Sequence, residues 1–210
     1  MTEEPLPSGD LLDLLDWKRR VSELYGSVRA ASDRREAWEW WRDTRAELFR
    51  THSQSPIAAA RRPAFPGLAF FDYDPGYRVL ARVRPAEAET YDIESSGDGS
   101  FRFTRFAMAD FGLTGQRLSL ECYWLAGYGG GLFLSFRDGT SGHDTYGAGR
   151  YLFDTVKGAD LGIEDGKLVL DFNFAYNPSC AYDPAWVCPL TTPANRLSIR
   201  IEAGEKTPPK

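Results

Sequence analysis

The stretch RLSLECYWLAGYGGGLFLSFRD, residues 117–138, decides the fold class of this chain. Its first half alternates apolar and polar side chains, which is the period of a β-strand. The apolar positions on one side are Leu118, Leu120, Cys122 and Trp124. A cluster of glycines at 127 and 129–131 then precedes a second apolar run, and hairpin turns need the positive φ angles that glycine adopts. The stretch therefore predicts two antiparallel strands joined by a glycine-rich turn.

The same two-residue period runs from residue 64 to near the end of the chain. It predicts further strands at 77–83, 101–108, 150–154, 167–176 and 197–202. Turn sequences such as SSGDGS (95–100) and IEDGK (163–167) separate them. Short strands at this spacing indicate an antiparallel sheet rather than βαβ units. We therefore expect a mainly β protein, built as an antiparallel β-barrel or a curled β-sandwich.

The first 52 residues have a helical period instead. From residue 11 to residue 28 apolar side chains recur at three- and four-residue steps, and Asp10 can cap this segment. A second helix is expected to begin at Ser32 or Asp33, because Asp33 and Glu36 have the spacing of a capping box. The sequence thus predicts two N-terminal α-helices packed on the β domain.

The second helix is rich in tryptophan. Its expected apolar stripe consists of Ala37, Trp38, Trp41, Leu48 and Phe49. Trp38, Trp40 and Trp41 cannot share one face, because a helix turns by about 100° per residue. At least one of them must pack against something other than the first helix, and both the β domain and a partner subunit are candidates.

The change of period near residues 53–56 divides the chain into domains. We expect an N-terminal helical region at 1–52, an antiparallel β domain at 53–206 and a disordered tail at 207–210. The tail follows from the polar and proline-rich ending EKTPPK.

The charge and composition exclude several classes of function. Thirty acidic residues against 25 basic ones give a net charge of −5, which leaves no basic surface for nucleic acid. No apolar run reaches the roughly 18 residues of a membrane span. The N-terminal sequence MTEEPLPSGD lacks the basic and apolar regions of a secretory signal. We therefore expect a cytoplasmic protein that binds neither nucleic acid nor a membrane.

Two of the three cysteines lie close together in sequence. Cys180 and Cys188 are spaced too widely for a zinc knuckle, and the histidines, His52 and His143, are far away in sequence. We therefore expect no metal and no other cofactor. Two reduced, packed thiols are the favoured state, and a disulfide that closes the loop between them is the alternative.

The predicted strand 167–176 carries polar residues on one of its two edges. Apolar side chains at 168, 170, 172, 174 and 176 can face a core. Asp171 and Asn173 lie on the other edge, which Asn177 would continue. In a small barrel such an edge orients a ligand inside the cavity, whereas in an open sheet it faces solvent. Both interpretations remain open from the sequence.

Two arginines flank a loop of small and polar residues in FRDGTSGHDTYGAGRYLFD, residues 136–154. Arg137 and Arg150 could hold a carboxylate or phosphate in two-point contact at the mouth of a barrel. The alternative for either arginine is a structural ion pair with an aspartate. The candidate aspartates are Asp138, Asp154 and Asp171.

Three long motifs resemble a known family, the domain of unknown function 1684. They are FRDGTSGHDTYGAGRYL (136–152), DFNFAYNPSCAY (171–182) and CPLTTPANRLSIRIEAGEK (188–206). Upstream, HSQSPI (52–57) and FPGLAFFDYDPGYRVLARV (65–83) are also similar to it, so that the resemblance covers roughly residues 41–206. The resemblance implies a β-rich fold and no assigned activity. Many members look secreted, and this sequence departs from them at its N-terminus.

Three hypotheses on function follow. The first is a β-barrel pocket that binds a small, anionic organic molecule. The residues expected to bind this ligand are Arg137, Arg150, Asn173, Asn177, Asn195 and Lys206. The second is an enzyme in the same pocket, with Asp171 or Glu205 as general base and Tyr146 as acid. The third is an interaction module that docks a partner, or a second copy in a homodimer, through the tryptophan-rich helices.

Overall fold

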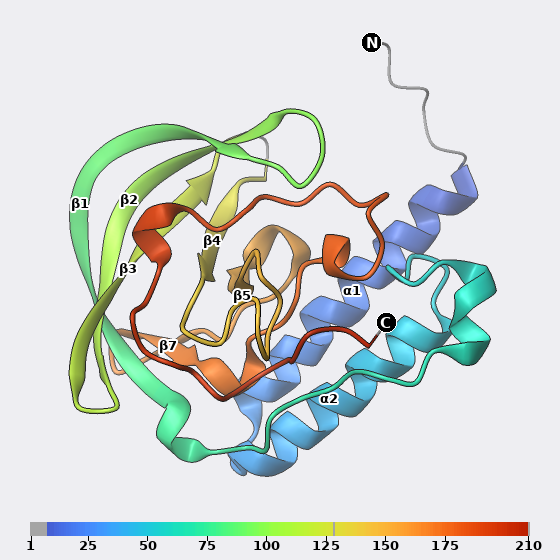
Figure 1. Ribbon diagram of the computed structural model, residues 1–210, viewed down its shortest axis with the longest axis horizontal. Coiled ribbons are helices and arrows are strands. Elements are labelled where there is room, and N and C mark those ends of the chain that lie inside the picture. The colour runs from blue at the N-terminus through green and yellow to red at the C-terminus, as the bar shows by residue number, and fades with distance from the viewer. Residues whose placement is uncertain (1–7, 128, 210) are drawn as a thin grey trace.

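The computed structural model describes residues 8–127 and 129–209, and within them two helices precede seven strands (Figure 1). The helices are α1 (Ser8–Ala30) and α2 (Arg34–Thr51). The strands are β1 (Arg78–Glu94), β2 (Ser100–Leu113), β3 (Gln116–Leu125), β4 (Gly131–Phe136), β5 (Arg150–Asp154), β6 (Ile163–Glu164) and β7 (Lys167–Asp171).

The seven strands form one antiparallel sheet in the order β5-β4-β3-β2-β1-β7-β6. Strands β1 to β5 follow one another as neighbours, and β7 pairs with the other side of β1. The long strands β1 to β3 curl strongly (Figure 1). Among the described residues, the outer strands β5 and β6 do not pair with each other, so the sheet stays open. The prediction of a mainly β, antiparallel fold with two N-terminal helices is confirmed.

A change of register in β2 gives the curled sheet two apolar clusters. Arg105 pairs with Tyr123, whereas Ala107 pairs with Cys122. Because such a bulge inserts one extra residue, it moves the side chains that follow onto the other face. Phe103, before the bulge, packs in a small aromatic cluster with Tyr123, whereas Ala107 belongs to the main core. The candidate site described below lies beside the smaller cluster.

Helix α2 begins as the sequence predicts. Asp33 is its N-cap, and the side chain of Asp33 accepts a hydrogen bond from the Glu36 N–H at 3.0 Å. All five residues of the expected apolar stripe are buried. Trp38 and Trp41 join residues of α1 and of the sheet in the main hydrophobic core, and Phe49 belongs to a smaller cluster with Ile57 and Tyr182, so α2 packs on the β domain as well as on α1.

The three tryptophans of α2 separate as their angular spacing requires. Trp38 and Trp41 are 4% and 1% exposed, whereas Trp40 is 47% exposed. The Trp38 indole N–H donates to the Asn173 carbonyl at 2.9 Å, and the Trp41 ring lies 5.2 Å from the ring of Phe174. Two of the three therefore pack against the chain's own β domain, which was one of the two expected partners.

The predicted strand 167–176 is shorter than expected. Strand β7 ends at Asp171, whose side chain accepts a hydrogen bond from the Asn173 N–H at 3.1 Å and caps a short 3-10 turn. The polar residues of this segment therefore do not continue along one strand edge. Their positions are set by the turn that follows.

The predicted strand at 197–202 does not form among the described residues. The carbonyls of Ile201 and Ala203 accept hydrogen bonds from the Arg150 guanidinium instead of from a neighbouring strand. Sequence alternation alone could not reveal this, because the donor is a side chain from a distant segment.

The chain after β7 crosses the open side of the sheet without forming another long element (orange to red in Figure 1). Near its end it runs beside the segment that links α2 to β1. There the Phe71 N–H donates to the Gly204 carbonyl at 3.0 Å, and the Lys206 N–H donates to the Ala69 carbonyl at 2.8 Å. This C-terminal segment thus covers the sheet and supplies one wall of the candidate site.

Two expectations about the ends of the chain fall partly outside the described residues. Residues 1–7 are not among them, and neither is Lys210, the last residue of the expected tail 207–210. Thr207, within that tail, donates its N–H to the Asp144 carbonyl at 2.9 Å. In the described part of the chain, no helix has the length and apolar character to cross a membrane.

Trp41→Ala should lower the free energy of unfolding by about 3–5 kcal/mol, because it leaves a large cavity between α2 and the β domain. Trp40→Ala, one position earlier on the exposed face, should cost less than about 1 kcal/mol. Chemical denaturation of both variants measures the difference. Equal losses would contradict the assignment of Trp41 to the core.

Candidate functional site

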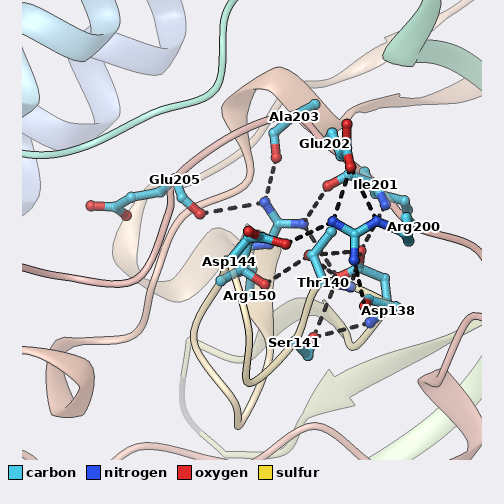
Figure 2. A network of polar contacts seen from close by, with 12 residues as sticks. Asp138, Thr140, Ser141, Asp144, Arg150, Arg200, Ile201, Glu202, Ala203 and Glu205 are labelled. Atoms are coloured by element: carbon cyan, nitrogen blue, oxygen red, sulfur yellow. Dashed lines mark hydrogen bonds and ion pairs between the residues drawn. The ribbon is translucent and has the colours of Figure 1, made fainter.

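Arg150, a predicted ligand-binding residue, lies at the centre of a buried polar network (Figure 2). Its side chain is 1% exposed and donates to the carbonyls of Ile201 at 3.1 Å, of Ala203, and of Glu205 at 3.4 Å. The same guanidinium lies 3.4 Å from the carboxylate of Asp138. The structural ion pair with Asp138, one of the alternatives from the sequence, is thus the environment in which the structure places Arg150.

Asp138 extends this network into the loop that precedes β5. One of its carboxylate oxygens accepts from the Ile201 N–H at 2.7 Å and from the Thr140 hydroxyl at 2.8 Å. At the surface, Arg200 pairs with Asp144 at 2.7 Å (Figure 2). The loop 137–149 and the chain segment 200–205 are therefore held together by charge-assisted bonds, which are stronger than neutral ones.

Glu205 is a second buried centre of polar contacts. Its carboxylate accepts from the hydroxyl of Tyr182, from the Asn177 N–H at 2.7 Å and from Arg45 of α2 at 3.3 Å. The Asn177 amide in turn donates to the carbonyl of Lys206 at 2.7 Å. Both oxygens of Glu205 are thus occupied by protein groups, and they link α2 to the C-terminal segment.

Asn173 and Asp171 support the turn after β7. The Asn173 side chain accepts from the Asp74 N–H at 3.0 Å and donates to the Asp74 carbonyl at 2.8 Å and to Asp171 at 2.9 Å. Burial raises the pKa of Asp171 to about 6, although the bonds from Asn173 and the charge of Arg78 oppose this rise. These residues join the turn to the segment before β1.

The remaining predicted residues lie elsewhere. Tyr146 lines an open cavity of about 580 Å³ together with Arg61 and Tyr182. Lys206 places its ammonium 4.6 Å from the centre of the Phe71 ring. The three catalytic candidates, Asp171, Glu205 and Tyr146, therefore occupy three different environments and do not face one shared cavity.

Asn195 fastens the C-terminal segment across two strands. It is fully buried, and its side-chain oxygen accepts from the Glu121 N–H at 2.7 Å. Its amide donates to the carbonyls of Glu121 at 3.0 Å and of Ser135 at 2.9 Å. Its backbone carbonyl accepts from the Arg137 N–H at 2.9 Å. Asn195 thereby sets where segment 190–195 stands over β3 and β4.

A cleft of about 620 Å³ opens between this segment and the sheet. Its lining comes from the end of β1, from β3, from the loop before β5 and from residues 190–194. Apolar walls are supplied by Tyr91, Ile93, Leu190 and Pro193. Of all residues predicted from the sequence to bind a ligand, Arg137 lines this cleft.

Arg137, which is partly exposed, differs from the buried Arg150 in the contacts of its side chain. Among the described residues its side chain makes no ion pair or hydrogen bond, and its Nε is buried. The hydroxyl of Thr191, which also lines the cleft, is buried without a partner as well. In a smaller cavity near β7, by contrast, Arg34 and Arg78 both pair with Glu164. A cation without a counter-charge inside a cleft is a site for an anion.

Gly149 makes room for Arg137 and Thr191. Its φ is +101°, a conformation that other residues rarely adopt. A Cβ at this position would lie 2.4 Å from the Thr191 hydroxyl and 2.9 Å from Cγ of Arg137. Glycine is therefore required where the side chains of Arg137 and Thr191 approach this backbone.

The carboxylate of Glu121, which also lines the cleft, already has protein partners. Glu121 accepts a hydrogen bond from the hydroxyl of Tyr123 and pairs with Arg105 at 3.0 Å. The hydroxyl of Thr192 lies 2.8 Å from that of Tyr123. Burial and the neighbouring Glu121 raise the pKa of Tyr123, so this residue stays a neutral hydrogen-bonding group.

The cleft residues that the sequence interpretation missed include Glu121, Tyr123, Thr191 and Thr192. A signal for the first two was present, since both stand on the edge of the predicted strand 117–125 opposite its apolar side. The two threonines stand within the motif CPLTTPANR, but only the structure brings them to Arg137.

Comparisons with known proteins agree with the fold. The family described as "Protein of unknown function (DUF1684)" matches residues 63–206, more than half of the chain, so the chain belongs to this family and the predicted resemblance is confirmed. The matched range begins after both helices. An uncharacterized protein of Haloarcula marismortui, solved by solution NMR, is 39% identical over 82% of this chain and 95% of that one, with a TM-score of 0.59. No curated protein matches the chain.

The raised pKa of Asp171 predicts an effect of pH on stability. The folded carboxyl releases its proton near pH 6 against an ordinary value of 3.8, so its stabilising contribution is complete below about pH 4 and is lost as the pH rises through 6. Asp171→Asn cannot ionise. Relative to this variant, the wild type should lose about 3 kcal/mol of unfolding free energy between pH 4 and pH 7. A difference independent of pH in denaturant titrations would contradict the burial of this carboxyl.

Proposed function

We propose that this protein binds a small organic anion in the cleft beside Arg137. The observation that carries the proposal is the unpaired guanidinium of Arg137, whose Nε is buried in a cleft of about 620 Å³. Small-molecule sites typically have volumes of about 300–1,000 Å³ and combine apolar walls with a few convergent polar groups. The cleft has both features.

The anionic group of the ligand would bind Arg137. A planar guanidinium offers parallel N–H donors that match a carboxylate or a phosphate. The Thr191 hydroxyl, also without a protein partner, supplies a second donor on the same side. Each bond would satisfy a group that folding leaves without a protein partner, and charge-assisted bonds of this kind contribute about 1.5–3 kcal/mol.

The ligand's organic part would lie against the apolar walls. Ile93 is buried and Tyr91 and Leu190 are partly exposed in the cleft, so an aliphatic or aromatic body can contact them. Of the three acidic side chains in the lining, Glu121 pairs with Arg105, Asp92 at the rim pairs with Arg102, and Glu94 is exposed to solvent. These pairs leave the charge of Arg137 available to the ligand.

The other predicted ligand-binding residues have indirect roles in this proposal. Asn195 positions segment 190–195 over the sheet, and Arg150 holds the chain that follows it. Asn173, Asn177 and Lys206 contact protein groups outside the cleft. In this proposal the ligand contacts Arg137 directly, and Asn195 and Arg150 hold the chain that forms one wall of the cleft.

The test uses benzoate and hexanoate as probes, with benzamide as the uncharged counterpart of benzoate. Both carboxylates should raise the melting temperature of the wild type in a concentration-dependent way, and benzamide should not. Arg137→Gln removes the charge and keeps most of the side-chain length. It should weaken carboxylate binding by about 10- to 100-fold while leaving the unliganded protein as stable as the wild type, because the guanidinium has no protein partner.

Arg196→Gln is the matched control. Arg196 is exposed and follows Asn195 in the chain, outside the lining of the cleft. This variant should bind the carboxylates like the wild type. Equal binding to the wild type and Arg137→Gln, or equal loss in both variants, would refute Arg137 as the anion contact.

A further inference from the structure

Thr191 and Thr192 are neighbours in the wall of the Arg137 cleft, but their hydroxyls have different surroundings. The Thr191 hydroxyl is buried without a partner among the described residues. The Thr192 hydroxyl lies 2.8 Å from that of Tyr123, which also lines the cleft. The two threonines therefore offer a ligand different hydrogen-bonding groups.

The direction of the bond between Thr192 and Tyr123 follows from Glu121. The Tyr123 hydroxyl donates its proton to one carboxylate oxygen of Glu121, and Arg105 donates to the other at 3.0 Å. A carboxylate can only accept, and burial raises the pKa of Tyr123, so that the phenol keeps its proton. Because Tyr123 has no second proton to give, it accepts the proton of Thr192. The hydroxyl protons thus point in one direction, from Thr192 through Tyr123 to Glu121.

The oxygen of Thr192 is left with acceptor capacity alone. A hydroxyl carries one proton and two lone pairs, and this proton is used in the bond to Tyr123. Thr192 also precedes the short 3-10 turn Pro193–Asn195. At such a position a threonine oxygen commonly accepts from a backbone N–H, but the side chain of Thr192 makes no capping bond. In the part of the chain that the structure describes, no protein donor satisfies its lone pairs.

Backbone hydrogen bonds fix the position of Thr192 relative to Arg137. The Thr192 carbonyl accepts from the Asn195 N–H at 3.1 Å, and the Asn195 carbonyl accepts from the Arg137 N–H at 2.9 Å. The Asn195 side chain is bonded to the backbone of Glu121 on β3. A side chain that donates to an anion and a hydroxyl that can only accept thus line one cleft on a shared support.

From these contacts we infer that Thr192 selects ligands that carry a hydroxyl group in addition to the carboxylate that binds Arg137. The inference rests on the proposed anion site and names the class of its ligand, a hydroxycarboxylate. The ligand hydroxyl donates to the Thr192 oxygen and extends the chain of hydrogen bonds that ends at Glu121, and bonds in such a chain strengthen one another. A ligand without a donor leaves the Thr192 oxygen unsatisfied where it displaces water.

The first test compares substituted benzoates by isothermal titration calorimetry. The meta- and para-hydroxybenzoates carry a donor, whereas the meta- and para-fluorobenzoates are close to them in size and carry none. At least one hydroxybenzoate should bind the wild type about three- to tenfold more tightly than its fluoro counterpart. Equal affinities within both pairs would overturn the role of Thr192 and leave the anion site intact. If no benzoate binds, the anion site itself fails.

Thr192→Val replaces the hydroxyl by a methyl group of similar size. This variant should lose the preference for the hydroxybenzoate and bind unsubstituted benzoate within about twofold of the wild type. Thr192→Ser keeps a hydroxyl and should retain the preference. A preference that survives in Thr192→Val would refute Thr192 as the partner of the ligand hydroxyl.

Tyr123→Phe tests the direction of the bonds, which a purely structural role of Thr192 would not affect. The variant keeps the aromatic ring in the smaller cluster and removes the acceptor of the Thr192 proton. Thr192 can then donate as well as accept. The probe is the methoxybenzoate substituted at the preferred ring position, because its ether oxygen only accepts. Relative to benzoate, its affinity should rise by at least about threefold from the wild type to Tyr123→Phe. An unchanged ratio would contradict the inferred direction.

Discussion

The buried guanidinium of Arg150 is the interaction on which the rest of the structure depends. It donates to the carbonyls of Ile201, Ala203 and Glu205 and pairs with Asp138, so that one side chain satisfies three carbonyls of segment 200–205 (Figure 2). Removing one partner of a buried ion pair costs about 3–5 kcal/mol, because the other charge is left uncompensated. The C-terminal segment covers the open side of the sheet because this contact and that of Asn195 hold it there.

The sequence predicts the local structure well where the periodicity is strong. The helical stripe of α2, the cap at Asp33 and the separation of the tryptophans follow from geometry along a single helix. The antiparallel strands follow from alternation and turn residues in the same way. Segment 197–202 is different: its alternation is that of a strand, but its Ile201 carbonyl accepts from the Arg150 side chain and its Ile199 carbonyl from the Gly139 N–H, partners that no local pattern identifies.

The candidate site could be predicted only in part, for a physical reason that Arg137 and Arg150 illustrate. Both flank the same loop and both are plausible anion ligands from the sequence. Asp138 is the sequence neighbour of Arg137, yet it pairs with Arg150, twelve positions away. Successive residues of an extended chain point to opposite sides, so Arg137 faces the cleft while Asp138 faces the buried network. Tertiary contacts thus decide which cation stays unpaired. The motif asparagines, Asn173, Asn177 and Asn195, use their side-chain amides in such contacts with other protein groups.

The central claim is that Arg137 carries the free charge of an anion site, and NMR of the arginine Nε–H groups tests it most directly. On titration with benzoate, the Arg137 Nε–H resonance should shift and saturate, whereas that of Arg150, already bonded to carbonyls and Asp138, should stay in place. An Arg137 resonance that does not move, or one that moves no more than that of exposed Arg196, would contradict the account.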